Sequence, residues 1–142
     1  KKIIPRSEIP AILSNRWGFS ILQQGGWTTI PNALLHNQKE LELSNSEFIV
    51  LIHIISFIHH GETPAFPSIA TLSERVNQHS RTVQRTITKL LKKKLLSRKI
   101  RSKSQNDKGL SNLYSIEPLV AKLANIQKKE ASLLSKQKEE KS

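Results

Sequence analysis

Residues 67–92 read PSIATLSERVNQHSRTVQRTITKLLK, and this stretch decides the fold. Its first part, 68–76, has apolar residues at helical spacing behind a serine, which predicts a short helix with a serine at its N-terminus. Asn77, Gln78 and His79 then interrupt the pattern, and asparagine tolerates the left-handed backbone that a tight turn between helices requires. A second helix, 80–93, follows, so the sequence predicts a helix-turn-helix pair.

The second helix has two faces of opposite character when its residues are placed about 100° apart. One face is apolar, with Val83, Ile87, Leu90 and Leu91. The opposite face carries Arg81, Arg85, Thr88 and Lys92. We expect the apolar face to pack on the domain and the polar face to contact a ligand.

The segment before this pair predicts a central helix over 44–60. Ser44 and Glu47 have the spacing of a capping box, in which each side chain accepts a hydrogen bond from a backbone amide at the helix start. Apolar residues cover most of the circumference of this helix, so it should be the most buried one: they are Phe48, Leu51, Ile52, Ile55, Phe57 and Ile58.

The segment after the pair changes to short β-type runs, 95–101 and 113–116, on either side of a polar, glycine-containing tip. This pattern predicts a β-hairpin with a long tip. A further helix is expected over 118–135, and 136–142 is expected to be a disordered tail.

Residues 1–26 predict an arm with a short helix over 9–13, a strand over 19–22 and Trp17 packed on the main body. Strand-like residues also fill 27–30, before a short helix that Pro31 opens. The predicted fold class is mainly α (α+β). It is a winged helix-turn-helix over 27–117, with a three-helix core, a hairpin wing and flanking terminal segments.

The positive charge of the chain is concentrated in one segment. The formal net charge is +12, and residues 81–108 hold eleven bases against the single acid Asp107. Residues 1–80 hold six bases and six acids and are therefore neutral. An evenly spread excess would indicate a solvated surface, whereas a dense patch attracts polyanions by releasing their counterions. Nucleic acid is therefore the predicted partner, and the helix-turn-helix arrangement makes it double-stranded DNA.

Several function classes are excluded by what the sequence lacks. The absence of cysteine excludes disulfides and zinc fingers, and no apolar run approaches the length of a membrane span, so a cytoplasmic protein without a membrane partner is expected. His53, His59 and His60 lack a cysteine or carboxylate at ligand spacing, so we expect no metal site. No phosphate loop, nucleophile motif or carboxylate pair is present, which predicts a protein that is not an enzyme and has no cofactor.

At the helix pair the sequence resembles the helix-turn-helix domains of plasmid and phage replication-initiation proteins, in 67–76 and 80–90. Residues 30–35 and 43–47 are similar to the start of phage replication proteins of the O type. The resemblance spans 27–101 and implies origin or operator binding. Three positions depart from it, because Asn77 and Lys94 stand where such domains usually have glycine, and His79 stands where they have a capping serine.

The resemblance implies that Arg81, Thr82, Gln84 and Arg85 are recognition positions. The donor groups of arginine match the edge of guanine, and the donor and acceptor groups of glutamine match the edge of adenine. For each of these residues, contact with a phosphate is the alternative. Lys89, Lys92, Lys93 and Lys94 are expected to meet phosphates, and the basic hairpin to follow the backbone or enter the minor groove. The predicted DNA-binding residues are Ser80, Arg81, Thr82, Gln84, Arg85, Thr88, Lys89, Lys92, Arg98, Lys99, Arg101, Lys103 and Lys108.

The first functional hypothesis is sequence-specific DNA binding in plasmid or phage replication initiation. A transcription regulator on an operator, an accessory protein of plasmid transfer or partition, and a winged helix for protein or RNA contacts remain alternatives. We expect a homodimer associated with the nucleoid or a plasmid, with other replication proteins as further partners. The arm before Gly26 or the helix after Pro118 would supply the contact between protomers.

Overall fold

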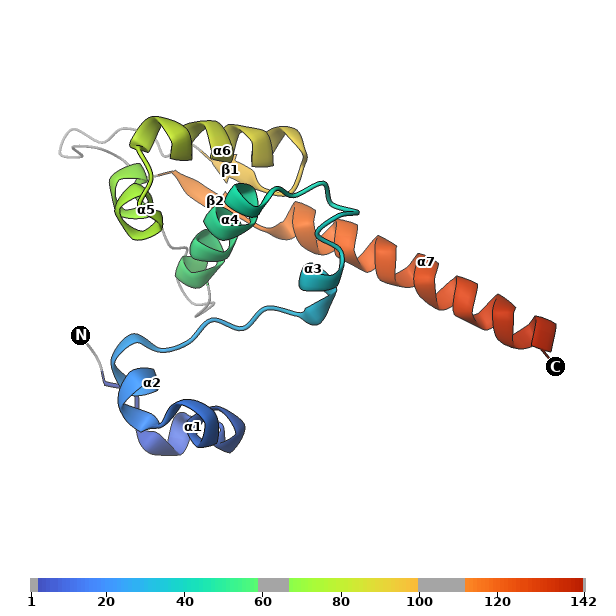
Figure 1. The fold of residues 1–142 in the computed structure, drawn as a ribbon, viewed down its shortest axis with the longest axis horizontal. Coiled ribbons are helices and arrows are strands. Elements are labelled where there is room, and N and C mark those ends of the chain that lie inside the picture. The colour runs from blue at the N-terminus through green and yellow to red at the C-terminus, as the bar shows by residue number, and fades with distance from the viewer. Residues whose placement is uncertain (1–2, 59–66, 100–111, 142) are drawn as a thin grey trace.

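A computed structural model describes residues 3–58, 67–99 and 112–141 of the chain (Figure 1). The fold is mainly helical with one small antiparallel hairpin, as the sequence predicts. Its elements in chain order are η1 (Arg6–Glu8), α1 (Ala11–Trp17), α2 (Phe19–Gly25), α3 (Asn32–His36), α4 (Asn45–Ile58), α5 (Ile69–Val76), α6 (Ser80–Lys92), β1 (Ser97–Lys99), β2 (Leu113–Ser115) and α7 (Glu117–Lys141).

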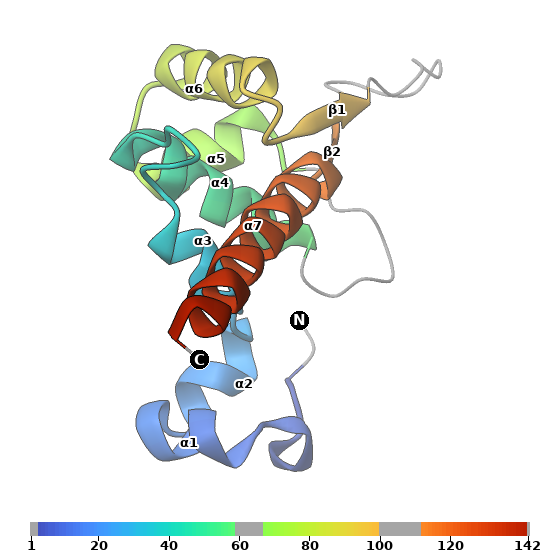
Figure 2. The same ribbon diagram turned by 90° about the vertical axis from the view of Figure 1, so that its right-hand side faces the viewer.

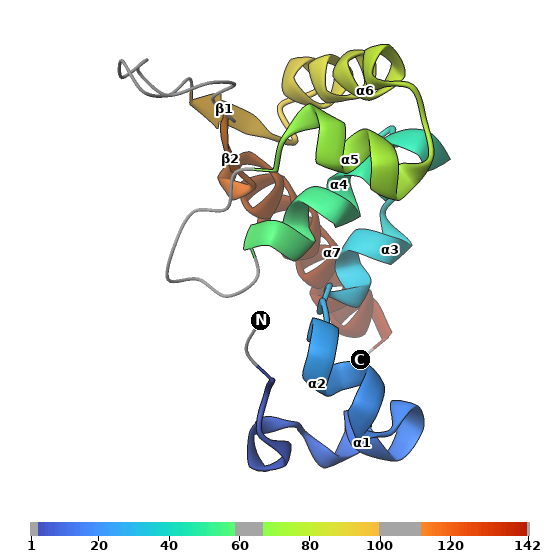
Figure 3. The same ribbon diagram turned by 90° about the vertical axis from the view of Figure 1, so that its left-hand side faces the viewer.

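Helix α4 is the centre of the hydrophobic core, as its nearly continuous apolar sequence predicts. Val50, Leu51 and Ile54 expose no surface, and α4 packs against both α5 and α6. Leu119 and Leu123 of α7 complete the same core. Seen from two sides, α4 lies beneath α6, and α7 passes across the domain (Figures 2 and 3). Figure 1 shows α7 continuing away from the domain.

The turn between α5 and α6 has the predicted construction. Ser68 caps α5 by accepting a hydrogen bond from the Thr71 amide at 3.0 Å. Asn77 ends α5 in the left-handed conformation, with φ of 54°. His79 caps α6, because its Nδ1 accepts from the Arg81 amide at 3.1 Å. The departures at Asn77 and His79 therefore preserve the turn.

The N-terminal arm differs from its prediction. Residues 19–22 belong to helix α2, not to a strand, and 27–30 form no strand either. Leu22 of α2 and Ile9 are buried, whereas Trp17 is 56% exposed and does not pack on the main body. A stretch of four residues with three apolar side chains fits one turn of helix as well as it fits a strand, and no strand of the described residues pairs with it.

The arm is closed on itself by polar contacts. The Ile4 amide donates to the Gln23 carbonyl at 3.0 Å, and Gln23 Nε2 donates back to the Ile4 carbonyl at 3.0 Å. The Arg6 guanidinium lies 4.6 Å from the centre of the Phe19 ring. The arm is thus a small folded unit, which the extended segment after Gly26 joins to α3 (Figure 1).

Helix α7 is longer than the sequence predicts. It continues to Lys141 through residues for which a disordered tail was expected, and its side chains from Gln127 to Glu139 are exposed. Lysine, glutamine, glutamate and leucine are good helix formers, so local propensity extends the helix without burial. Within the described residues, no helix combines the length and apolar character needed to cross a membrane.

Candidate nucleic-acid interface

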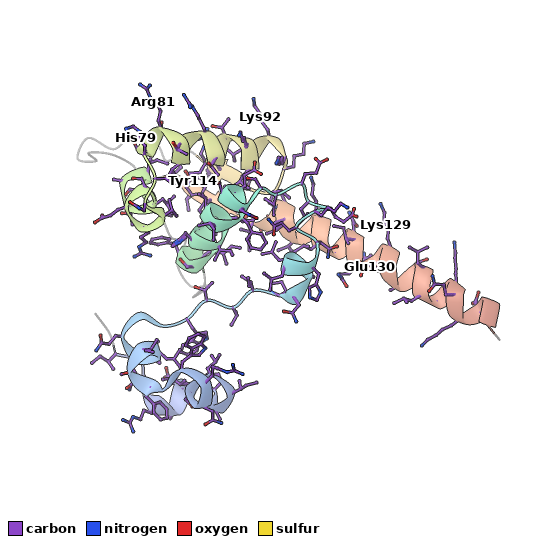
Figure 4. All side chains as sticks on the ribbon, viewed as in Figure 1. His79, Arg81, Lys92, Tyr114, Lys129 and Glu130 are labelled. Carbon is purple, nitrogen blue, oxygen red and sulfur yellow. The ribbon has the colours of Figure 1, made fainter. Side chains whose placement is uncertain are left out.

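The outer face of α6 presents every residue that the sequence assigns to recognition on this helix. The buried face is formed by Val83, Ile87 and Leu90, which are at most 1% exposed. Figure 4 shows Arg81 and Lys92 projecting from the side of α6 that faces away from α4. The exposed predicted residues of α6 are Ser80, Arg81, Thr82, Gln84, Arg85, Thr88, Lys89 and Lys92.

The cations on this face carry uncompensated charge. Helix α6 contains no acidic residue, and among the described residues no ion pair joins Arg81, Arg85, Lys89 or Lys92 to a carboxylate. Thr88 Oγ1 donates to the Gln84 carbonyl at 2.9 Å, so its hydroxyl proton is used within the helix. The face therefore offers cationic donors for an anion and one side-chain amide with both donor and acceptor groups.

The side chain of Lys93 does not lie where the sequence predicts. It was expected to project toward a phosphate, but it turns into the domain. Its Nζ lies 2.8 Å from Glu47 Oε1 and also donates to the Glu42 carbonyl. The Lys93 carbonyl in turn accepts from Lys122 Nζ at 2.6 Å. Lys93 therefore connects the end of α6 to the start of α4 and to α7.

Glu47 is the buried carboxylate of this connection. The Ser44 amide donates to Glu47 Oε1 at 2.7 Å, and the Glu47 amide donates to Ser44 Oγ at 3.1 Å, which is the predicted capping box. Burial raises the pKa of Glu47, but the hydrogen bonds from Lys93 and Ser44 outweigh it and hold this pKa below the ordinary value. The capping box was visible in the sequence, whereas the pairing with Lys93 had no local signal.

The wing is an antiparallel pair in which Arg98 faces Tyr114 and Lys99 faces Leu113. Arg98 and Lys99 are exposed, while Tyr114 is buried in the core. The first strand begins at Ser97, two residues later than predicted. Leu95 and Leu96 before it are core residues, and Lys94 adopts a left-handed backbone with φ of 57°.

Five residues named in the sequence analysis lie outside the described residues: they are Arg101, Lys103 and Lys108 of the predicted wing, and His59 and His60. His53 is partly buried on α4, and in the described part of the chain no group of three or more candidate ligands is arranged to hold a metal ion.

A contact between α4 and α5 was not predicted from the sequence. The guanidinium of Arg75 in α5 lies 4.6 Å from the centre of the Phe57 ring in α4, a cation–π distance. It fixes the first helix of the pair to the central helix from the solvent side. An arginine and a phenylalanine this far apart in sequence give no signal by spacing alone.

Comparisons with known proteins show which family and which folds the chain is similar to. The family model of the DnaD N-terminal domain matches residues 30–133. The crystal structure of the N-terminal domain of DnaD protein from Geobacillus kaustophilus HTA426 is similar to this chain with a TM-score of 0.60 and 23% identity, over 90% of this chain and 99% of that one. The S. aureus MepR–DNA complex matches with a TM-score of 0.42 and 14% identity, over 78% of each chain. No curated protein matches the chain.

These findings confirm the predicted fold class, since α5, α6 and the hairpin form a winged-helix-like arrangement. The predicted relation to replication-initiation proteins is confirmed. The matching family, however, is that of DnaD and not the O-type phage proteins that the sequence suggested. The prediction that the chain is not an enzyme is also confirmed by the family. With a match over more than half of its length, the chain belongs to the DnaD N-terminal domain family, a non-catalytic domain of a replication-initiation protein.

Proposed function

We propose that this domain binds double-stranded DNA at specific sequences during replication initiation, with α6 in the major groove and the cations of β1 on the adjacent backbone. The observation that carries the proposal is the outer face of α6, where Arg81, Arg85, Lys89 and Lys92 are exposed without acidic partners among the described residues. A helix that is buried on one side and cationic on the other suits the groove, whose walls are lined with phosphates.

The dimensions of α6 separate base contacts from phosphate contacts. Its 13 residues span about 20 Å at about 1.5 Å per residue, and the N-terminal residues of a recognition helix are the ones that contact base edges. The N-terminal half therefore reaches base edges, and the C-terminal half meets the groove wall. Arg81 and Arg85 are about 6 Å apart along the axis, close to two base-pair steps of about 3.4 Å.

The side-chain chemistry then assigns roles to individual residues. Arg81 and Arg85 donate to guanine, and Gln84 pairs with adenine in the step between them. Lys89 and Lys92, near the C-terminal end of α6, contact phosphates and position the helix.

Selection of bound fragments from a random duplex library, with affinities measured by fluorescence anisotropy, tests the proposal. The intact domain should enrich a short motif, and Gln84→Ala should relax the preference at one position of it. Gln127→Ala, on the exposed part of α7, is the matched control, since it removes the same side-chain amide away from α6. Enrichment of no motif would contradict specific binding, and an equal change of preference in the control would contradict the base contact of Gln84.

Replication is distinguished from the two other DNA-binding roles by where the sites lie. The family favours an origin, whereas a regulator would occupy promoters and an accessory protein would occupy transfer or partition sites. Mapping of bound sites in cells, by crosslinking and sequencing, decides among them. Sites confined to promoters would exclude the replication role of this interface.

The proposal includes a homodimer on two half-sites, with other replication proteins as further partners. One winged helix covers few base pairs, and two linked copies multiply modest affinities. Exposed apolar residues mark both terminal segments as contact surfaces: they are Ile12, Trp17 and Ile21 in the arm, and Leu133 and Leu134 on α7.

Sedimentation of the intact chain, with and without a duplex of two half-sites, tests the dimer. Removal of 1–26 or of 127–142 should weaken assembly, and the second cut lies after Ile126 because Leu119 and Leu123 are core residues. A 1:1 complex of the intact chain at saturating protein would contradict the dimer. Unchanged assembly after both removals would assign the contact to another surface.

A further inference from the structure

A mostly apolar groove of about 760 Å³ lies between the wing, the end of α4 and the start of α7. Ile58, Leu113, Ile116 and Val120 line it with hydrocarbon. Its volume falls within the range of about 300–1,000 Å³ that is common for small-molecule sites. The DNA-reading face of α6 does not contribute to it.

The described charged residues of this groove carry more positive than negative charge. Arg98 and Lys99 line it from β1, and among the described lining residues the single acid is Glu117, the first residue of α7. Neither cation forms an ion pair with another described residue. The groove therefore combines an apolar wall with an excess of positive charge at one side.

We propose that this groove binds a small amphipathic anion, an alkyl or aryl group that carries a carboxylate. The hydrocarbon would cover Val120, which is 55% exposed although it is apolar. The carboxylate would pair with Arg98 and Lys99, which supply the charge-assisted donors that such a head group requires. A neutral or cationic amphiphile of the same length satisfies only the first condition.

Occupancy of the groove would oppose DNA binding, a consequence that rests on the proposed function. Arg98 and Lys99 are the described cations of the wing, and a carboxylate paired with them competes with a DNA phosphate. Because linkage is reciprocal, the ligand should weaken DNA binding by the same factor by which DNA weakens ligand binding.

Titration of the whole chain with decanoate, without DNA, tests the site directly by calorimetry and methyl NMR. Decanoate should saturate one site and shift the methyl signals of Val120 and Ile116. Val120→Glu should weaken binding by about tenfold or more, because it places a like charge against the apolar wall. Ile49→Glu makes a comparable apolar-to-acid change on α4, at a position that is 49% exposed and does not line the groove, and should leave decanoate binding unchanged.

Equally tight binding of decylammonium would overturn the proposal, as would an equal loss in both glutamate variants with intact circular dichroism spectra. In the DNA-binding arm of the experiment, decanoate should weaken duplex binding by the wild type and by Ile49→Glu, but not by Val120→Glu. Failure of every variant to bind DNA while decanoate binds normally would contradict the proposed function and leave the groove intact. Unweakened DNA binding in saturating decanoate would overturn the coupling.

Discussion

Replacement of Lys93 by methionine should destabilise the domain by about 2 kcal/mol without removing any exposed side chain from the outer face of α6. The side chain of Glu47 is 4% exposed, so the substitution leaves a buried carboxylate without its cation. Breaking a fully buried pair costs about 3–5 kcal/mol. The cost is lower here because Lys93 is 31% exposed and Glu47 keeps the hydrogen bond from the Ser44 amide.

Urea unfolding at neutral pH measures this loss. Lys92→Met is the matched control, since it removes the neighbouring charge from an exposed position and should change the free energy of unfolding by less than about 0.5 kcal/mol. Glu47→Gln should cost less than Lys93→Met, because glutamine also completes a capping box. The double variant should resemble Glu47→Gln, since no buried charge remains. Additive losses, or a Lys93→Met variant as stable as its control, would refute the reasoning.

The same pair predicts a pH dependence. The pKa of Glu47 is lowered in the folded protein from its ordinary value of 4.5, so the stability that the pair contributes is present above pH 4.5. It is lost as the pH falls through the folded pKa, because the carboxylate is then protonated in both states. The stability difference between wild type and Lys93→Met should therefore shrink in acid. A constant difference from neutral pH to well below 4.5 would contradict this assignment.

Three further changes test the interface and the turn. Arg85→Ala should weaken binding to the selected site by about 1–3 kcal/mol more than binding to random DNA, and equal losses would make Arg85 a phosphate contact. Lys103→Ala and Lys108→Ala should each reduce the slope of log affinity against log salt by up to about one unit, and an unchanged slope would place the wing off the DNA. Lys94→Gly should raise thermal stability by about 1 kcal/mol by relieving the left-handed backbone at φ of 57°, whereas Lys94→Ala keeps that strain. An equal gain in both Lys94 variants would attribute the effect to charge.

Local signals predicted the helix pair well because each of its features is decided within a few residues. Ser68 and Asn77 act on backbone groups of their own helix, and the period of apolar residues fixes which side of α6 is buried. The arm lacked such signals. Residues 19–22 contain too few positions to separate a helical period from a strand period, so packing of Leu22 in the arm decided the outcome.

The candidate site also has one part that local sequence predicts and one part that depends on packing between distant residues. The outer face of α6 follows from helical geometry, and all of its predicted residues are exposed. Lys93 was misassigned because its surroundings depend on Glu47, a residue 46 positions away that only the packing of α6 on α4 brings near. A run of three lysines looks uniform in sequence, yet the end of the helix turns the middle one inward.

Lys93 also helps to hold α6, the helix that we propose enters the major groove. At its N-terminal end α6 is fixed by the His79 cap and the turn at Asn77, and at its C-terminal end by the contacts of Lys93 with Glu47 and of Lys122 with the Lys93 carbonyl. A helix held at both ends does not have to be ordered when it meets DNA, so little affinity is lost to that step. Discrimination among sequences would then depend on the exposed side chains alone. Lys93→Met, measured well below its unfolding midpoint, should accordingly lower affinity for the selected site without changing which sequence is selected, whereas Arg85→Ala should change the selected sequence.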